Sequence, residues 1–216
     1  MNICIRVDAN KAIGLGHFYR QIAFADLFVK FGFSCTFILS NIDKNIQNIL
    51  EEKKHAFFII RPTKELNEHN YINNILKEQN AKAIILDGYH LATLTQNLQG
   101  SKTKVILFQD HYECQEHPDI LININSKKNN YLKKHTTKIF SGFDYLCLRK
   151  EFRETSTEFV RTPRELKKCI LFFGGSNTNQ YTEKVLTSLM KLGYKTLSYT
   201  VILGPLSQSN EKIKRL

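Results

Sequence analysis

The sequence lacks a hydrophobic run long enough to cross a bilayer, and it lacks a signal-peptide pattern because residues 1–8 already read as a strand. It also has no C-x-x-C pair, which argues against a disulfide framework. The cysteines are odd in number and scattered: Cys4, Cys35, Cys114, Cys147 and Cys169. These absences predict a cytoplasmic protein with reduced thiols and no membrane span.

A third glycine is missing from the most distinctive segment of the chain. Residues 6–20 read R-V-D-A-N-K-A-I-G-L-G-H-F-Y-R, with Tyr19 where the dinucleotide-binding motif requires glycine. The second predicted strand, residues 34–39, also ends in Ser40-Asn41 and not in an acidic residue that would hold a ribose. These two differences argue against a nicotinamide cofactor.

Basic residues exceed acidic ones, giving a formal net charge of +11. Part of this excess is local: Lys127, Lys128, Lys133, Lys134 and Lys138. No nucleic-acid-binding motif accompanies these lysines, which lie in an Asn-rich, solvated segment. We therefore expect no nucleic-acid partner. The positive charge has another use, since a basic surface also attracts a small anionic substrate.

Predicted strands and helices alternate along the chain, which is typical of an α/β protein with parallel sheets. The first strand precedes a helix with apolar positions Phe18, Ile22, Ala25 and Val29. Further predicted strands are residues 56–60, 83–87, 104–109 and 120–124. No pattern specifies an oligomeric state.

The apolar pattern lapses over residues 153–166, which we interpret as a linker. The sequence predicts an N-terminal domain over residues 1–152 and a second α/β domain that starts at residue 167. Residues 167–216 contain a strand at 169–173, a helix and a strand at 197–203, too little for a full core. We therefore expect two Rossmann-like domains, the second one incomplete in this chain.

His17 is the leading candidate for a catalytic group. It follows the Gly14-Leu15-Gly16 turn at the start of a predicted helix, where free backbone N–H groups favour a phosphate or carbonyl oxygen. The two glycines permit a tight turn and close approach of a ligand. An imidazole with a pKa near neutrality can take a proton from water.

The residues flanking His17 are further candidates for substrate binding or for support. Asp8 and Arg6 lie at the end of the first strand, and Arg20 is placed to hold the helix start or to pair with Asp8. Tyr89 follows the carboxyl end of a strand and is a candidate substrate contact. Asp87 is expected to fix the loop backbone.

A second glycine loop follows the first strand of the second domain. Gly174, Gly175 and Ser176 precede a helix, as the first loop does, and their N–H groups suit the negative charge of a departing diphosphate. A plain turn that packs helix on strand remains the alternative.

A metal site is the other possibility among these polar residues. Asp110, His111, Cys114 and His117 have the spacing D-H-x-x-C-x-x-H. No second cluster accompanies them, whereas structural zinc sites draw paired ligands from two places. We expect no metal and interpret this segment as a polar loop at the rim of the site.

Several motifs in order carry a resemblance to a known family. They are R-V-D with I-G-L-G-H-F-Y-R in residues 6–20, L-D-G-Y at 86–89, Q-D at 109–110, D-I-L-I-N-I-N at 119–125, G-F-D-Y-L-C-L-R-K-E-F at 142–152 and the glycine loop at 174–176. This series resembles the UDP-sugar hydrolases of pseudaminic acid biosynthesis. One departure is Gln109, where the family more often has an aspartate, and another is the family's C-terminal uridine pocket, which this sequence does not include.

The resemblance implies a two-domain GT-B fold and an enzyme without metal or organic cofactor. It implies that His17 is the catalytic histidine and Tyr89 an active-site tyrosine. The substrate would be UDP-2,4-diacetamido-2,4,6-trideoxy-β-L-altropyranose, attacked by water at the anomeric carbon with inversion and release of UDP. Two alternatives remain open: a GT-B glycosyltransferase with a UDP-sugar donor, or a non-catalytic sugar-nucleotide-binding module. With only the start of its UDP-binding domain, the 216-residue chain is expected to be nearly inactive.

Overall fold

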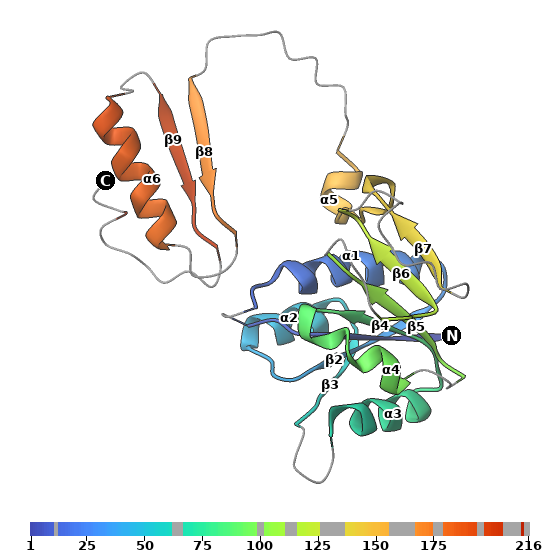
Figure 1. The fold of residues 1–216 in the computed structure, drawn as a ribbon. Helices are drawn as coiled ribbons and strands as arrows, with labels where there is room; N and C mark the ends of the chain where they lie inside the picture. Colours follow the sequence, from blue (N-terminus) through green and yellow to red (C-terminus); the bar gives the residue numbers. More distant parts are fainter. Residues whose placement is uncertain are drawn as a thin grey trace. The chain divides into compact units, whose positions relative to one another are not determined.

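The structure is a computed structural model that describes residues 1–10, 13–61, 67–98, 102–110, 116–125, 137–155, 167–174, 179–193, 197–204 and 213. The chain divides into two compact units (Figure 1). Unit 1 comprises Met1–Ala9 and His17–Glu154, and unit 2 comprises Thr155–Leu216 with the segment Asn10–Gly16. The domain boundaries expected from the sequence stay a prediction.

Unit 1 is built on a seven-stranded sheet in the order β3-β2-β1-β4-β5-β6-β7. The strands are β1 (Asn2–Val7), β2 (Ser34–Leu39), β3 (Ala56–Ile59), β4 (Ala81–Asp87), β5 (Lys104–Phe108), β6 (Ile120–Asn123) and β7 (Lys138–Ser141). Every neighbouring pair is parallel. The parallel α/β sheet predicted from the sequence is therefore confirmed. The order reverses between β1 and β4, and such switch points are where open α/β sheets bind ligands.

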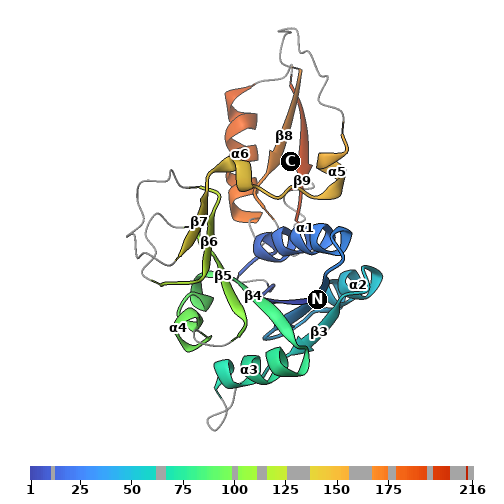
Figure 2. The same cartoon turned by 90° about the vertical axis from the view of Figure 1, so that its right-hand side faces the viewer.

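Helices cover both faces of this sheet. They are α1 (Gly16–Lys30), α2 (Lys44–Glu52), α3 (Glu68–Glu78), α4 (Leu94–Leu98) and α5 (Lys150–Arg153), with short 3₁₀ helices η1 (Tyr89–Leu91) and η2 (Phe143–Tyr145). In both Figure 1 and Figure 2, α1 lies on one face while α3 and α4 lie on the other. This division follows from right-handed crossovers that run in opposite directions from the two central strands.

The two-residue period of the central strands decides which side chains meet which helix. On β4, Ile84 and Leu86 point into the core beneath α3 and α4, and Cys4 of β1 belongs to the same cluster. Asp87 is the next residue after Leu86, so it points toward the face that α1 covers, since successive side chains alternate. Burial of the strands on both faces explains their nearly continuous apolar sequences.

Unit 2 repeats the strand–helix–strand arrangement. Strands β8 (Lys168–Phe172) and β9 (Ser198–Ile202) are parallel and joined through α6 (Asn179–Leu192). These elements agree closely with the strand, helix and strand predicted after residue 166. Several apolar side chains of this unit are exposed, including those of Ile170 and Phe172.

Three features of the fold differ from the sequence-based expectations. Val29, assigned to the buried stripe of the first helix, is exposed near the end of α1. Strand β7 was not anticipated, and it begins at Lys138, which we had assigned to a solvated segment; Lys127, Lys128, Lys133 and Lys134 lie outside the described residues. Helix α4 was also missed. No described helix is long and apolar enough to span a membrane.

Candidate active site

The candidate site lies at the carboxyl ends of β1 and β4, the two strands at the switch point. Val7 is paired in register with Asp87, so Asp8, the next residue after β1, emerges beside the end of β4. Both carboxylates are buried. Two buried acids on adjacent strand ends each need positively charged or hydrogen-bonding partners, because an unpaired buried charge is costly.

Helix α1 supplies the partners of Asp87 from one of its faces. His17, Arg20 and Gln21 are spaced i, i+3 and i+4, so they lie on the same side of the helix. His17 Nδ1 is 2.8 Å from Asp87 Oδ1, while Arg20 Nε and Gln21 Nε2 donate to Oδ2 at 2.9 and 2.6 Å. The start of α1 is thereby fixed over the end of β4.

Arg20 also links Asp87 to a third acid. Its Nη1 and Nη2 donate to the two carboxylate oxygens of Asp110, which follows β5, at 2.7 and 3.2 Å. The guanidinium lies over the Phe108 ring, 5.3 Å from its centroid. Burial by itself would lower the pKa of Arg20, but the hydrogen bonds that it donates to Asp87 and Asp110 raise it, so the guanidinium stays charged. We call Arg20, Asp87, Asp110 and His17 the Asp87 cluster.

The protonation of Asp87 determines the tautomer of His17. Burial by itself would raise the pKa of Asp87, but hydrogen bonds from His17 and Arg20 lower it below its usual value. The carboxylate is therefore ionised and can only accept. Arg20 Nη2 also lies 3.0 Å from His17 Nδ1, but its two hydrogens are donated to Asp87 Oδ1 and Asp110 Oδ2. We therefore assign the proton of a neutral His17 to Nδ1, where it is donated to Asp87. Nε2 then carries a lone pair, and no other described residue forms a hydrogen bond with it. This is the state that a general base requires.

Tyr89 completes the surroundings of His17. Its ring packs edge-on against the imidazole with 5.2 Å between centroids, and its side chain is 58% exposed. The residue belongs to η1, directly after Gly88 and the end of β4. Tyr89 therefore lies beside the candidate base with access to solvent.

A second group of charges surrounds Asp8. Arg6 donates to both of its oxygens at 2.7 and 2.8 Å, and the backbone N–H and the hydroxyl of Ser40 each donate to Oδ1 at 2.8 Å. Arg6 Nε also donates to Glu68 of α3 at 2.7 Å, and His90 Nε2 lies 2.9 Å from Asp8 Oδ2. Burial would raise the pKa of Asp8, but Arg6 and Ser40 hold it well below its usual range. We call Arg6, Asp8, Glu68 and His90 the Asp8 cluster.

The first glycine turn has a defined backbone. Gly14 N–H donates to the Asn10 carbonyl at 2.7 Å, and Ile13 N–H donates to the Asn10 side chain at 2.9 Å. Gly14 has φ +85°, in the left-handed region that favours glycine. A Cβ on Gly16, where α1 begins, would meet no atom within 4 Å.

The structure places the remaining predicted site residues as follows. Gly174 follows β8 in unit 2 with φ +94°, whereas Gly175 and Ser176 lie outside the described residues. His111 and Cys114 of the considered metal segment also lie outside them. Among the residues that are described, no group of three acidic, histidine or cysteine side chains could hold a metal ion.

Two expectations about side-chain partners need correction. Of the two roles expected for Arg20, the pairing with Asp8 is not formed: Arg20 points toward β4 and pairs with Asp87 and Asp110, while Asp8 is held by Arg6, two residues before it. Asp87 was expected to fix the loop backbone, but its oxygens accept side-chain hydrogen bonds from α1.

Sequence reasoning also missed His90 as a member of the site, and it placed Asp110 in a polar loop at the rim of the site without identifying it as a partner of Arg20. The position of His90 one residue after Tyr89, at the end of a strand ending on an acid, was the signal that could have identified it. Its partner Asp8 is 82 residues away, and that pairing is visible only once β1 and β4 are neighbours.

Comparison with known proteins identifies the fold. No protein-family model matches the chain. The uncharacterized protein MJ1062 of Methanocaldococcus jannaschii is 26% identical over 225 aligned residues; the match covers 100% of this chain but only 45% of that protein.

Two solved structures are similar over almost the entire chain. MurG of Acinetobacter baumannii has a TM-score of 0.56 at 10% identity, with 98% of this chain and 69% of that one covered. A glycosyltransferase from Rickettsia africae has a TM-score of 0.58 at 10% identity, with 99% and 70% covered. The chain therefore has an α/β fold of the GT-B type, the fold of these glycosyltransferases.

Proposed function

We propose that this chain belongs to a sugar-nucleotide hydrolase in which His17 is the general base. The observation that carries the proposal is the pairing of His17 Nδ1 with the buried, ionised Asp87, which leaves Nε2 as the proton acceptor. The site lies where parallel sheets bind ligands. The motif series of residues 6–20 and 86–89 supports the UDP-diacetamido sugar named above as the substrate.

In this mechanism, a water molecule attacks the anomeric carbon of the sugar. As the carbon–oxygen bond forms, Nε2 of His17 takes a proton from the water, and Asp87 stabilises the resulting imidazolium. The bond between the anomeric carbon and the UDP oxygen breaks, with its electron pair leaving on UDP. Attack opposite the leaving group inverts the anomeric configuration. None of the steps assigned to this chain's residues requires a metal.

A GT-B glycosyltransferase is the second candidate, favoured by the names of the two structural neighbours. His17 would then remove the proton from an acceptor hydroxyl instead of from water. The two functions differ in one measurable respect, since a transferase releases UDP only in proportion to the acceptor that it glycosylates.

The test is to incubate the full-length protein carrying this chain with the UDP-sugar in ¹⁸O-labelled water. We expect UDP release without an acceptor, with the label in the sugar and none in UDP. His17→Asn keeps an amide at the Nδ1 position but removes Nε2, and we expect turnover to fall by about two to four powers of ten. His69→Asn, on α3 at the opposite face of the sheet, is the matched control and should keep full activity.

Other outcomes have clear meanings. UDP release that depends on an added acceptor would establish the transferase in place of the hydrolase. Label in UDP would mean attack at phosphorus, and only a few-fold loss in His17→Asn would remove His17 from the role of base.

A further inference from the structure

The two charge clusters at the switch point contain the same kinds of charged group: one arginine, two carboxylates and one histidine. Each contains one arginine that bridges two carboxylates, and in each a histidine is paired with the more buried carboxylate. Their connections are crossed: the acid after β1, Asp8, holds the histidine that follows β4, and the acid that ends β4, Asp87, holds the histidine that follows β1. The proposed hydrolysis uses only His17, so the duplicate at His90 has no role in it.

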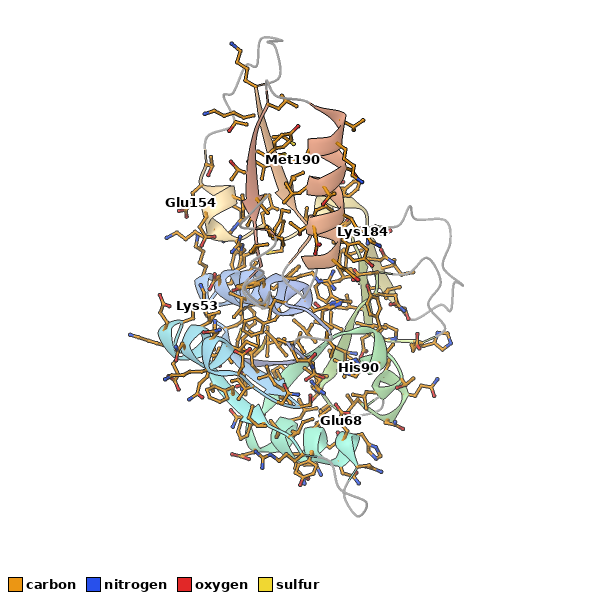
Figure 3. All side chains as sticks on the ribbon, turned by 90° about the vertical axis from the view of Figure 1, so that its left-hand side faces the viewer. Lys53, Glu68, His90, Glu154, Lys184 and Met190 are labelled. Atoms are coloured by element: carbon orange, nitrogen blue, oxygen red, sulfur yellow. The ribbon has the colours of Figure 1, made fainter. Side chains whose placement is uncertain are left out.

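His90 presents the opposite nitrogen from His17. Its Nε2 faces the ionised Asp8, so in the neutral ring the proton lies on Nε2 and Nδ1 is left over. The side chain is 48% exposed, and no other described residue forms a hydrogen bond with Nδ1. Figure 3 labels His90 on η1 and Glu68 on α3, the two outer members of the cluster.

The charges around His90 favour its protonated form when an anion approaches. Arg6 contributes one positive charge, and Asp8 with Glu68 contributes two negative charges, so with a neutral imidazole the cluster carries a net charge of −1. Protonation of His90 brings this sum to zero and converts Nδ1 into an N–H donor. The cluster with a neutral His90 repels a negatively charged oxygen. With a protonated His90, that oxygen can accept a charge-assisted hydrogen bond from Nδ1–H.

His90 and His17 belong to one site because Tyr89, the residue before His90, packs against the imidazole of His17. In the proposed reaction the attacking water lies between His17 Nε2 and the anomeric carbon, and the diphosphate is attached to the opposite side of that carbon through a single oxygen. The diphosphate is the charged part of this substrate, so it is the group to which a protonated imidazole beside the base would form the strongest hydrogen bond.

We propose that His90, held by Asp8, binds a phosphoryl oxygen of the sugar nucleotide through Nδ1–H and takes up a proton when the substrate binds. This role rests on the proposed function, because the phosphoryl group comes from that substrate. His90 is a binding residue here, and His17 remains the base. Binding should therefore weaken as pH rises, because the Nδ1–H donor is present only in the protonated ring.

The experiment uses the full-length protein with His17→Asn, which removes hydrolysis and the other imidazole of the site. Binding of the UDP-diacetamido sugar is measured by calorimetry at several pH values, in buffers of different ionisation enthalpy, with and without His90→Gln. Gln retains an amide near the Nε2 position that faces Asp8 but has no counterpart of Nδ1. His69→Gln is the control substitution.

We expect His17→Asn to take up protons, at most about one per bound UDP-sugar, when it binds this ligand, with affinity falling by up to about tenfold per pH unit. Adding His90→Gln should abolish the proton uptake and weaken binding about tenfold at pH 6, with little change at pH 8.5. In the otherwise unchanged protein, His90→Gln should raise KM near pH 6 and leave kcat within about threefold.

The contrary outcomes separate the two proposals. If the protein hydrolyses the UDP-sugar but His90→Gln changes neither KM nor proton uptake, only the role of His90 is overturned. If the free diacetamido sugar shows the same His90-dependent binding, the contact is to an acetamido carbonyl and the phosphoryl assignment is wrong. If the protein neither binds nor hydrolyses the UDP-sugar, the proposed function fails and this inference fails with it.

Discussion

Asp87 shows how a single buried residue links stability to the chemistry of the site. It has no exposed surface, and it is kept ionised by His17, Arg20 and Gln21. Removal of such an acid leaves its buried partners without their counter-charge, and this is a more damaging change than loss of an exposed ion pair. The residue that orients the base is thus also one on which unit 1 depends for stability.

Stability should therefore fall in acid. The pKa values of Asp8 and Asp87 are lowered in the folded state, so the unfolded chain binds protons more readily. Their stabilisation is fully present above the unfolded pKa of about 4 and is lost as pH falls through the folded values. We expect urea midpoints to decline steeply below about pH 4. Asp87→Asn should cost about 3 kcal/mol at pH 7 and should show a shallower decline; equal slopes would contradict this account.

His55 should act in a different pH range. Its side chain is buried against Phe37, with 5.3 Å between ring centroids, and Nε2 has no hydrogen-bond partner among the described residues. Burial lowers the pKa of His55 below 6.5, although Asp26 acts in the opposite direction. The unfolded state therefore takes up the proton first, and stability is lost as pH falls below about 6.5.

The variant His55→Phe keeps an aromatic ring at this position but cannot titrate. Its free energy of unfolding should change less between pH 7.5 and 5 than that of the unchanged protein, where one histidine contributes up to about 1.4 kcal/mol per pH unit. The measurement is urea unfolding at several pH values, with His69→Gln as a control. A pH dependence that His55→Phe leaves intact would show that another group is responsible.

At the scale of elements, the accuracy of sequence reasoning followed burial. Strands β1, β2, β4 and β5 are buried on both faces, so apolar runs predicted them closely. Strand β7 has a single exposed lysine and three half-buried residues, and α4 has only five residues, so neither gives a clear period. Short or half-exposed elements depend on their neighbours more than on their own sequence.

The glycine turn before α1 provides a test at this scale. Gly14 has φ +85°, whereas Gly16 is not in the left-handed region and has open space at its Cβ position. Gly14→Ala should lower the free energy of unfolding by about 1–2 kcal/mol, since an L side chain is strained there. Gly16→Ala should stay within about 0.5 kcal/mol. Equal losses in urea unfolding would argue against backbone strain as the cause.

At the scale of the whole chain, the strand order determines the site. The sequence identified His17 and Tyr89 as site candidates, because a glycine turn and a strand end are local signals. It did not identify Asp87 as the partner of His17 or Asp8 as the partner of His90. Those pairings depend on β1 and β4 being neighbours, and a single sequence contains no local pattern for that adjacency.

Unit 1 should fold without unit 2. The seven-stranded sheet, the main core cluster and both charge clusters belong to it. A fragment of residues 1–154 is therefore expected to unfold cooperatively, with an m-value of about 1–3 kcal/mol/M in urea. Circular dichroism and the dispersion of amide NMR signals are the measurements. A non-cooperative transition, with the longer chain unfolding cooperatively, would show that the units depend on each other.

The crossed pairing of the two histidines also bears on how the protein acquires its site during folding and synthesis. His17 and Asp87 are 70 residues apart, and Asp8 and His90 are 82 residues apart. Each contact closes a long loop, so neither histidine meets its carboxylate until β1 has paired with β4. In a chain with only β1, α1 and β2 in place, Asp8 and His17 both lack their partners. The tautomer of His17 is then not fixed by Asp87. During synthesis, neither imidazole can therefore gain its carboxylate before the end of β4 and residue 90 have left the ribosome.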